Sequence, residues 1–408
     1  MTQNSPTKLS RPEFVTLMAL MTSLIALSID SMLPAFNAIH RDFRLQTPDQ
    51  LQMVIAILFL GFGFGQLIFG QLSDIFGRKP PIYWGVAIFA MGSVLAGMTQ
   101  SFEWFLIGRF LQGFGGAAPR IISLALIRDE YKGNAMAQIT SMVMTIFILV
   151  PALAPTLGQG VIYFFHWRAI FILLCVVALS LWAWFAIRQH ETLPPGLRRG
   201  FTAKQLVFGV KETFRQPTTV SCMIVSGILF GIFVGYLGSA QEIFSRIFHM
   251  EKLFPLMFGI LALSIGGASF FNSRLVMALG MRRLILGAFL WMALISNLFA
   301  LYLTNYLPST PPPLMVFMIY MILTFFSVGF LFGNLNALAM EPLGHVAGVG
   351  SALIGFVQST ISVAIGIFLG KYYHESILPL VLSFGGASLI CIFILSLEKR
   401  FHHRMLQD

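Results

Sequence analysis

Long runs of apolar residues alternate with short polar segments along the whole chain. Each run is about 20 residues long, the length with which a helix crosses about 30 Å of hydrocarbon at about 1.5 Å per residue. The runs cover residues 14–36, 50–72, 81–99, 104–126, 137–163, 168–187, 219–239, 254–273, 284–304, 314–339, 349–370 and 377–397. They lack the amphipathic periodicity of helices in soluble proteins. The pattern predicts an all-α integral membrane protein with twelve spans in a lipid bilayer.

Charge supports this prediction and orients the chain. Only 10% of the residues are charged, against about 25% in soluble domains. If the N-terminus is cytoplasmic, the cytoplasmic segments hold 18 Lys and Arg, the outer segments hold six, and Arg109 and Arg120 lie within spans. The positive-inside rule then predicts that both termini are cytoplasmic. Because the net charge of +10 is spread over short loops beside spans, it argues against nucleic-acid binding.

The spans fall into two halves. The longest polar break, 188–217, follows six spans and predicts a first bundle at 1–187, a cytoplasmic linker at 188–217 and a second bundle at 218–408. Part of the pattern at 70–81 recurs 203 residues later, at 273–284. Two related six-helix halves are typical of transporters that rock about a central cavity.

A charged turn interrupts two apolar runs in the stretch "GQLSDIFGRKPPIYWG". Gly70 and Gly77 permit tight turning and close helix approach. Asp74 is suited to accept from backbone N–H groups at a helix N-terminus or to pair with a basic side chain. Arg78 and Lys79 are expected to hold the turn at the cytoplasmic headgroup boundary, although an ordinary positive loop is the alternative.

Asp30 is an acidic residue inside the first apolar run. A carboxylate within a span costs about 2.5–3.5 kcal/mol on insertion scales, so it should face a cavity or a partner. Desolvation favours its neutral form, which suits a group that binds and releases protons. Pro34 removes the N–H that would bond to the Asp30 carbonyl and should loosen the helix. The alternative is that Asp30 is solvated near the outer end of the span.

Arg109 is a permanent cation inside the fourth span and must find an anion, a carbonyl or water. Two roles are open: it acts electrostatically on a proton site, or it clamps helices together. Gln112 is expected to bind substrate or Arg109, or to pack. Arg120 and Arg128 lie nearer the cytoplasmic end, where snorkelling to the headgroups is expected.

Other residues are candidates for motion or for a cavity. Pro151 and Pro155, followed by Gly158 and Gly160, should bend the fifth span and allow close packing. They predict a hinge or seal, or kinked packing without motion. Tyr236 is expected at the outer mouth of the cavity or at a solvated helix end.

The pattern G-x-L-x-D-x-x-G-R-K resembles the signature loop of the major facilitator superfamily, although Ile75 stands where that family often has a basic residue. "IGRFLQGFGGAAPR" resembles the fourth-helix motif of drug/proton antiporters, with Arg109 and Gln112 in register. "ALAPTLGQG" resembles their fifth-helix motif, with Gln159 in place of a glycine. "SIDSMLPAF", "HWRAIF", "ETLPP" and "GHVAGVGSALIGFVQ" extend the resemblance to the Bcr/CflA type of multidrug exporter.

This resemblance implies the major facilitator fold: twelve transmembrane helices in two six-helix bundles around a central cavity. It implies a monomeric proton-coupled antiporter that exports hydrophobic or amphipathic small molecules across the bacterial inner membrane. Asp30 would carry the proton, and Arg109 would lie near the cavity and tune proton release. Gln112, Met32 and Thr22, which replaces a second acid found in some relatives, would line the cavity with Tyr236. The resemblance also implies that the charged loop latches the two bundles.

The energy source would be the proton gradient. We find no P-loop, metal-ligand pattern or cofactor motif. All eight histidines lie in loops or tails, which argues against an enzyme with a catalytic His in the membrane. A dedicated exporter of one native metabolite, such as a siderophore, remains the alternative function.

Overall fold

The structure is a computed structural model that describes residues 9–47, 49–198, 203–306, 310–370, 372 and 376–405. These residues form helices, turns and loops, with no strand among them. The first half comprises α1 (Arg11–Asp30), η1 (Leu33–Ala35), α2 (Phe36–Asp42), α3 (Asp49–Phe76), α4 (Lys79–Met98), α5 (Phe102–Glu130), α6 (Gly133–Phe164) and α7 (Ala169–Arg188). Next come η2 (Pro195–Leu197) and α8 (Ala203–Arg215). The second half comprises α9 (Pro217–Glu242), η3 (Ile243–Ile247), η4 (Glu251–Leu253), α10 (Phe254–Leu279), α11 (Met281–Tyr306), α12 (Leu314–Met340), η5 (Glu341–Val346), α13 (Ala347–Gly370) and α14 (Leu378–Met405).

Eleven of the twelve predicted spans each coincide with one helix of the structure, and the first covers α1, η1 and the start of α2. Among the described residues, eleven segments are long and apolar enough to cross a membrane, and one of them, Leu314–Leu369, holds both α12 and α13. Several helices run past the predicted ends, as α5 does by continuing to Glu130. Hydropathy detects only the apolar part of a helix, whereas its polar ends stay helical outside the hydrocarbon. The chain is a multi-pass membrane protein.

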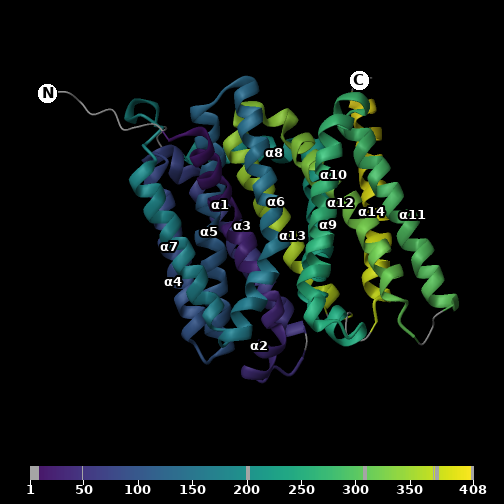
Figure 1. Cartoon of the computed structure of the whole chain (residues 1–408). Coiled ribbons are helices and arrows are strands. Elements are labelled where there is room, and N and C mark those ends of the chain that lie inside the picture. Colours follow the sequence, from purple (N-terminus) through teal and green to yellow (C-terminus); the bar gives the residue numbers. More distant parts are fainter. Residues whose placement is uncertain are drawn as a thin grey trace.

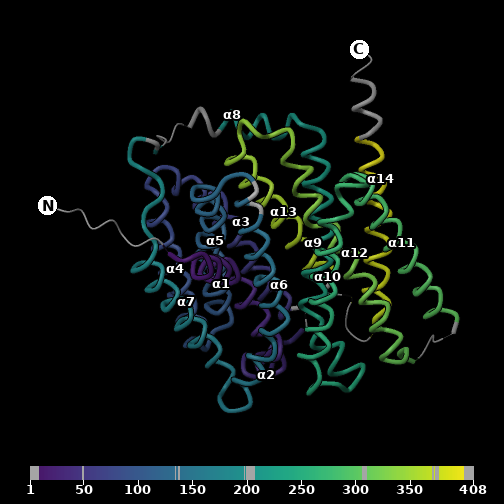
Figure 2. Tube along the Cα trace, turned by 45° about the horizontal axis from the view of Figure 1, so that its top comes forward, coloured from purple at the N-terminus to yellow at the C-terminus, as the bar shows by residue number. Residues whose placement is uncertain are grey.

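The helices form two groups that stand side by side (Figure 1). The first bundle, α1 to α7, and the second bundle, α9 to α14, each pack internally. They meet where α3 lies along α13 and where α6 lies along α10. We call the end at which α1 begins and α14 ends the upper end, as in Figure 1, and the other the lower end. The linker helix α8, which was not predicted, packs against α9 and α13 at the upper end (Figure 2).

Small residues let the two bundles approach closely. A Cβ added to Gly63 of α3 would lie 2.9 Å from the Cβ of Ser359 in α13. One added to Gly259 of α10 would lie 3.0 Å from the carbonyl oxygen of Ala152 in α6. Membrane helices commonly pack through such small residues because burial of apolar surface drives no association within lipid.

The first span is a broken helix. α1 ends at Asp30, and a turn leads into η1 and α2. Pro34 has no N–H to donate to the Asp30 carbonyl. The Met32 N–H donates to the carbonyl of Ile29 at 3.2 Å rather than to that of Ser28. The predicted loosening is therefore confirmed, and the Ser28 carbonyl loses its usual helical donor.

Candidate functional site

Asp30 lies at the break in the first span. Only 5% of the Asp30 surface is exposed. The alternative prediction, that Asp30 is solvated near the outer end of the span, is therefore wrong. Within the described ranges, its carboxyl group makes no hydrogen bond or ion pair. Tyr236 of α9, in the second bundle, lies close enough to Asp30 for the two side chains to interact electrostatically. A carboxyl group buried without a cation is costly to ionise inside a membrane.

Arg109 is fully buried and connects several helices. Its Nη1 donates to the carbonyl of Ser28 at 3.2 Å and to Oε1 of Gln112 at 2.7 Å. Its Nε donates to the carbonyl of Val54 at 3.4 Å. The Gln112 amide donates to Oγ of Ser93 at 2.8 Å. These bonds join α5 to α1, α3 and α4, as expected for a helix clamp.

The carbonyl that Arg109 binds on α1 is the one that the break leaves free. A carbonyl without a donor in hydrocarbon costs several kcal/mol, so the cation stabilises the end of α1 where it stops being helical. No hydrogen bond or ion pair joins Arg109 to Asp30 in the described part of the chain. The positive charge nevertheless sits against the backbone two residues before Asp30.

The remaining predicted cavity residues are all buried in this conformation. Thr22 is fully covered, and its hydroxyl donates to the Met18 carbonyl of its own helix at 2.7 Å. Met32 is also fully covered. Tyr236 packs edge-on against Phe325, with ring centroids 5.0 Å apart, and is fully buried. The expectation that Tyr236 lies at an outer mouth or a solvated helix end is therefore wrong.

The charged turn between α3 and α4 forms an ion cluster at the upper end. The Arg78 Nη1 donates to Asp74 at 2.6 Å and to Ser73 at 2.8 Å, and its Nε donates to Asp129 at 2.8 Å. Burial opposes the charge, but the bonds to Asp129 and Asp74 outweigh it and raise the pKa of Arg78 above its ordinary value. Asp74 also faces the first turn of α13, where its Oδ2 lies 3.8 Å from the position of a Cβ on Gly348.

The two glycines of this turn behave differently. Gly77 has a φ of +94°, a conformation that favours glycine. Gly70 has nothing within 4 Å of an added Cβ, so the close helix approach expected there is not found. The Lys79 Nζ donates to the carbonyl oxygens of Gln189 at 2.6 Å and Ala186 at 3.1 Å. Lys79 therefore caps the end of α7 rather than serving only as a headgroup anchor.

Glu191 caps the start of α4, a role that was not predicted from the sequence. Its carboxylate accepts from the backbone N–H of Arg78 at 2.8 Å and of Lys79 at 3.0 Å. The next two residues, Pro80 and Pro81, have no N–H to satisfy. One carboxylate thus serves both free donors of this helix N-terminus. The double proline could have pointed to this need, but not to the residue that meets it.

The antiporter-like segment forms one continuous helix, α6, with Pro151 and Pro155 inside it. Gly158 lies against the carbonyl of Ser31, which a Cβ would overlap, so close packing is confirmed there. It joins α6 to the break in the first span. Gly160 is exposed with nothing within 4 Å of an added Cβ, so the packing expected there is not found.

Arg120 does not snorkel to the upper end as expected. Its guanidinium carbon lies 4.9 Å from the ring centroid of Phe147 and 5.9 Å from that of Phe62. These rings belong to the middle of α6 and α3. Arg128 is exposed in the last turn of α5, as snorkelling predicts.

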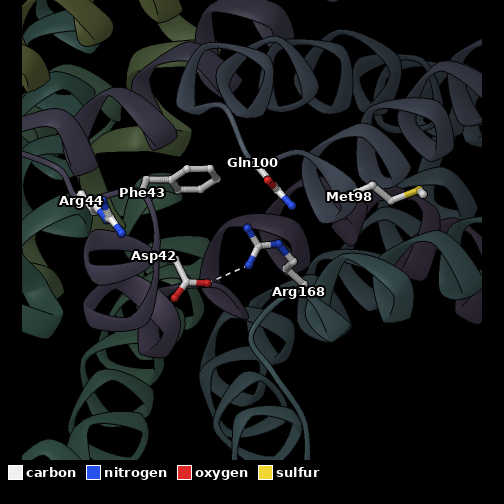
Figure 3. Close-up of a pocket in the computed structure, with 6 residues that line it drawn as sticks. All are labelled: Asp42, Phe43, Arg44, Met98, Gln100 and Arg168. Carbon is white, nitrogen blue, oxygen red and sulfur yellow. Dashed lines mark hydrogen bonds and ion pairs between the residues drawn. The ribbon is translucent and has the colours of Figure 1, made fainter.

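A second polar cluster lies at the lower end, where α2 lies (Figure 1), and Figure 3 shows its ion pair between Asp42 and Arg168. Oδ2 of Asp42 accepts from the Arg168 guanidinium at 2.7 Å and from the Trp167 indole at 2.8 Å, and Nε2 of His166 lies 3.2 Å away. This cluster fastens the end of α2 to the start of α7. It borders a cavity of about 690 Å³ lined by Asp42, Phe43, Arg44, Met98, Gln100 and Arg168.

Comparison with known proteins identifies the architecture. The family model described as Major Facilitator Superfamily matches residues 16–367. This chain belongs to the Major Facilitator Superfamily. Similar curated proteins include a bicyclomycin resistance protein homolog of Haemophilus influenzae, 28% identical over 93% of this chain and 94% of that protein. Another is the multidrug resistance protein MdtL of Shewanella oneidensis, 26% identical over 85% of this chain and 86% of that protein.

Solved structures of this superfamily share the fold. A D-xylose–proton symporter matches with a TM-score of 0.76 at 16% identity, covering 94% of this chain and 97% of that protein. The predicted major facilitator fold is confirmed. The chain is a transporter of small molecules and not an enzyme.

Proposed function

We propose that this superfamily member is a proton-coupled antiporter that exports hydrophobic or amphipathic small molecules, drugs included, by alternating access. The observation that carries the proposal is Asp30, a buried carboxyl group without a partner among the described residues, at a helix break beside Tyr236 of the second bundle. The names of the relatives, for bicyclomycin and multidrug resistance, support drug export.

The coupling follows from the cost of a buried charge. With a proton on Asp30, the bundles can close over a neutral group. When the proton leaves, the carboxylate needs water or a cation, and an open arrangement is favoured. If substrate binding favours the deprotonated state, proton and substrate compete as linked ligands. The proton gradient then supplies the energy, and no cofactor is required.

The contact between Asp74 and the first turn of α13 would act as the latch. A carboxylate beside a helix N-terminus is favourable because the helix dipole is positive there. In the proposed cycle this contact forms when the upper end closes and breaks when it opens. Arg78 and Asp129 would hold the carboxylate of Asp74 in position on the first bundle.

The distribution of Lys and Arg supports an orientation. The segments expected to be cytoplasmic hold 18 Lys and Arg, against six in the outer segments, and this difference favours a cytoplasmic upper end. We therefore propose that both termini lie in the cytoplasm. We also propose that the protein works as a monomer in the inner membrane of a bacterium, in line with the bacterial relatives.

Everted membrane vesicles test the coupling. An imposed pH gradient, acidic inside, should drive accumulation of a drug or dye by the wild-type protein and fail to do so with Asp30→Asn. Glu251→Gln removes an exposed carboxylate on the other bundle and should leave accumulation unchanged. Full gradient-driven accumulation by Asp30→Asn would remove Asp30 from the mechanism.

A substrate panel in a host that lacks its own exporters tests the cargo. Resistance to several unrelated drugs supports a multidrug exporter. Export of one metabolite without drug resistance would favour a dedicated exporter of a native compound, such as a siderophore. The Asp30→Asn variant serves as the inactive control in both cases.

A further inference from the structure

Arg120 lies on the same face of α5 as Arg109. They are eleven residues apart, which is three helical turns, or about 16 Å along the axis. Arg109 makes its three hydrogen bonds within the first bundle through Nε and Nη1, whereas its buried Nη2 has no partner among the described residues. Arg120, by contrast, is partly exposed and makes no hydrogen bond or ion pair with any residue that the structure describes. A guanidinium has five N–H donors and stays charged, so this group is free to bind an anion.

The guanidinium lies far from either membrane surface. Phe62 lies 14 residues before Phe76, the last residue of α3. Phe147 comes 14 positions after Gly133, the first residue of α6. Fourteen residues of helix span about 20 Å. Since Arg120 contacts both rings, its charge is at mid-depth, out of reach of the lipid headgroups at the upper end.

The residues that follow these rings in the chain touch the second bundle. Gly63, after Phe62, faces Ser359 of α13. Ile148, after Phe147, packs against Gly266 of α10. Each of these contacts lies on one of the two lines along which the bundles meet. The Arg120 side chain reaches between those lines, on the side of the first bundle that faces the second.

We propose that Arg120 is the anion-binding residue of the transport site, and that the transported compounds include molecules with one carboxylate on an aromatic body. This inference rests on the proposed export function and adds a substrate class to it. A guanidinium binds a carboxylate through two parallel N–H···O bonds. The ring of Phe147, which is partly exposed beside the guanidinium, provides an apolar surface on which the aromatic part of such a molecule can pack. A cationic compound would be repelled at the same place.

Binding to the purified full-length protein in lipid nanodiscs tests this proposal. Naphthoate, naphthylmethanol and naphthylmethylammonium share one ring system and differ in charge. We expect calorimetry to show tightest binding of naphthoate. Arg120→Gln should weaken naphthoate binding about tenfold, or about 1.4 kcal/mol, and change naphthylmethanol binding less than about twofold. Arg120→Lys keeps the charge but cannot form the bidentate pair with a carboxylate. Its naphthoate affinity should therefore lie between those of the wild type and Arg120→Gln.

The control is Arg283→Gln, which removes an exposed positive charge from α11 and should bind all three probes as the wild type does. Unchanged naphthoate binding by Arg120→Gln would overturn the proposal, as would a wild-type protein that binds no probe or prefers the ammonium compound. If Arg120→Gln does not fold, Arg120→Lys provides the test. The proposal requires that its ratio of naphthoate affinity to naphthylmethanol affinity be lower than that of the wild type.

These measurements use no pH gradient, so they separate the two proposals. If Asp30→Asn still accumulates drug in vesicles while Arg120→Gln loses naphthoate, the coupling proposal fails and the anion site stands. If Asp30→Asn abolishes gradient-driven accumulation while Arg120→Gln binds naphthoate as the wild type does, the anion-site proposal is wrong and the coupling proposal stands.

Discussion

The guanidinium of Arg109 donates a hydrogen bond of 3.2 Å to the carbonyl oxygen of Ser28, where the first span breaks. That carbonyl is free because the Met32 N–H donates to Ile29 instead. The free Ser28 carbonyl needs a hydrogen-bond donor, and the buried guanidinium of Arg109 needs acceptors. The bond between them therefore stabilises both the end of α1 and the buried charge. The arrangement fixes the end of α1, and with it the position of Asp30, to the core of the first bundle.

Replacing Arg109 should therefore reduce stability as well as transport. Arg109→Ala leaves the Ser28 and Val54 carbonyls without their guanidinium donor, and we expect a loss of about 2–3 kcal/mol in stability. Arg109→Lys keeps a charge but cannot reach all three acceptors and should lose less. Thermal unfolding in detergent measures the effect, with Arg283→Ala as the surface control. A protein as stable as the wild type after Arg109→Ala would contradict the clamp.

Pro34→Ala should repair the broken helix. The new N–H can donate to the Asp30 carbonyl, which would extend α1 toward α2. We expect slower amide hydrogen exchange at residues 31–35 and reduced transport, because the backbone around Asp30 loses its freedom to rearrange. Hydrogen exchange with mass spectrometry measures the first effect, and vesicle accumulation measures the second. Exchange as fast as in the wild type would show that the break has another cause.

The architecture and the break could be predicted from the sequence because both depend on local properties. A bilayer demands about 20 apolar residues per span, so twelve apolar runs indicate twelve helices. A proline removes one particular hydrogen bond, so Pro34 predicts a break at Asp30. An acidic residue inside a span is visible without knowing its neighbours.

Other roles depend on which helix lies beside which, and they could not be predicted. Snorkelling was a sound expectation for Arg120 from its place along α5, but contacts with α3 and α6 direct the side chain inward. Glu191 is far from Lys79 in sequence, and only the fold brings its carboxylate to the start of α4. Tyr236 lies near a predicted helix end, yet α9 extends to Glu242 and packing buries the ring.

Gly158 and Gly160 make a matched pair for testing the α6 contact. In Gly158→Ala the new methyl group overlaps the Ser31 carbonyl, so α6 must move away from the break in the first span. Gly160→Ala meets open space and should be tolerated. We expect Gly158→Ala to lower the unfolding temperature and to impair transport at equal expression, with Gly160→Ala matching the wild type. Equal behaviour of the two variants would mean that the α6 contact is not required.

Glu191 should contribute measurably to the stability of the upper end. Glu191→Ala leaves the Arg78 and Lys79 N–H groups without acceptors, and loss of a helix cap costs about 1–2 kcal/mol. Glu191→Gln retains one acceptor oxygen and should lose about half as much. Because Glu191 does not touch Asp30, both variants should keep gradient-driven transport at temperatures where they remain folded. Thermal unfolding measures the order wild type, Gln, Ala, with Glu251→Ala as the control for removing an exposed carboxylate. If the alanine variant unfolds at the wild-type temperature, water replaces the carboxylate at no cost, and the capping argument for the double proline fails.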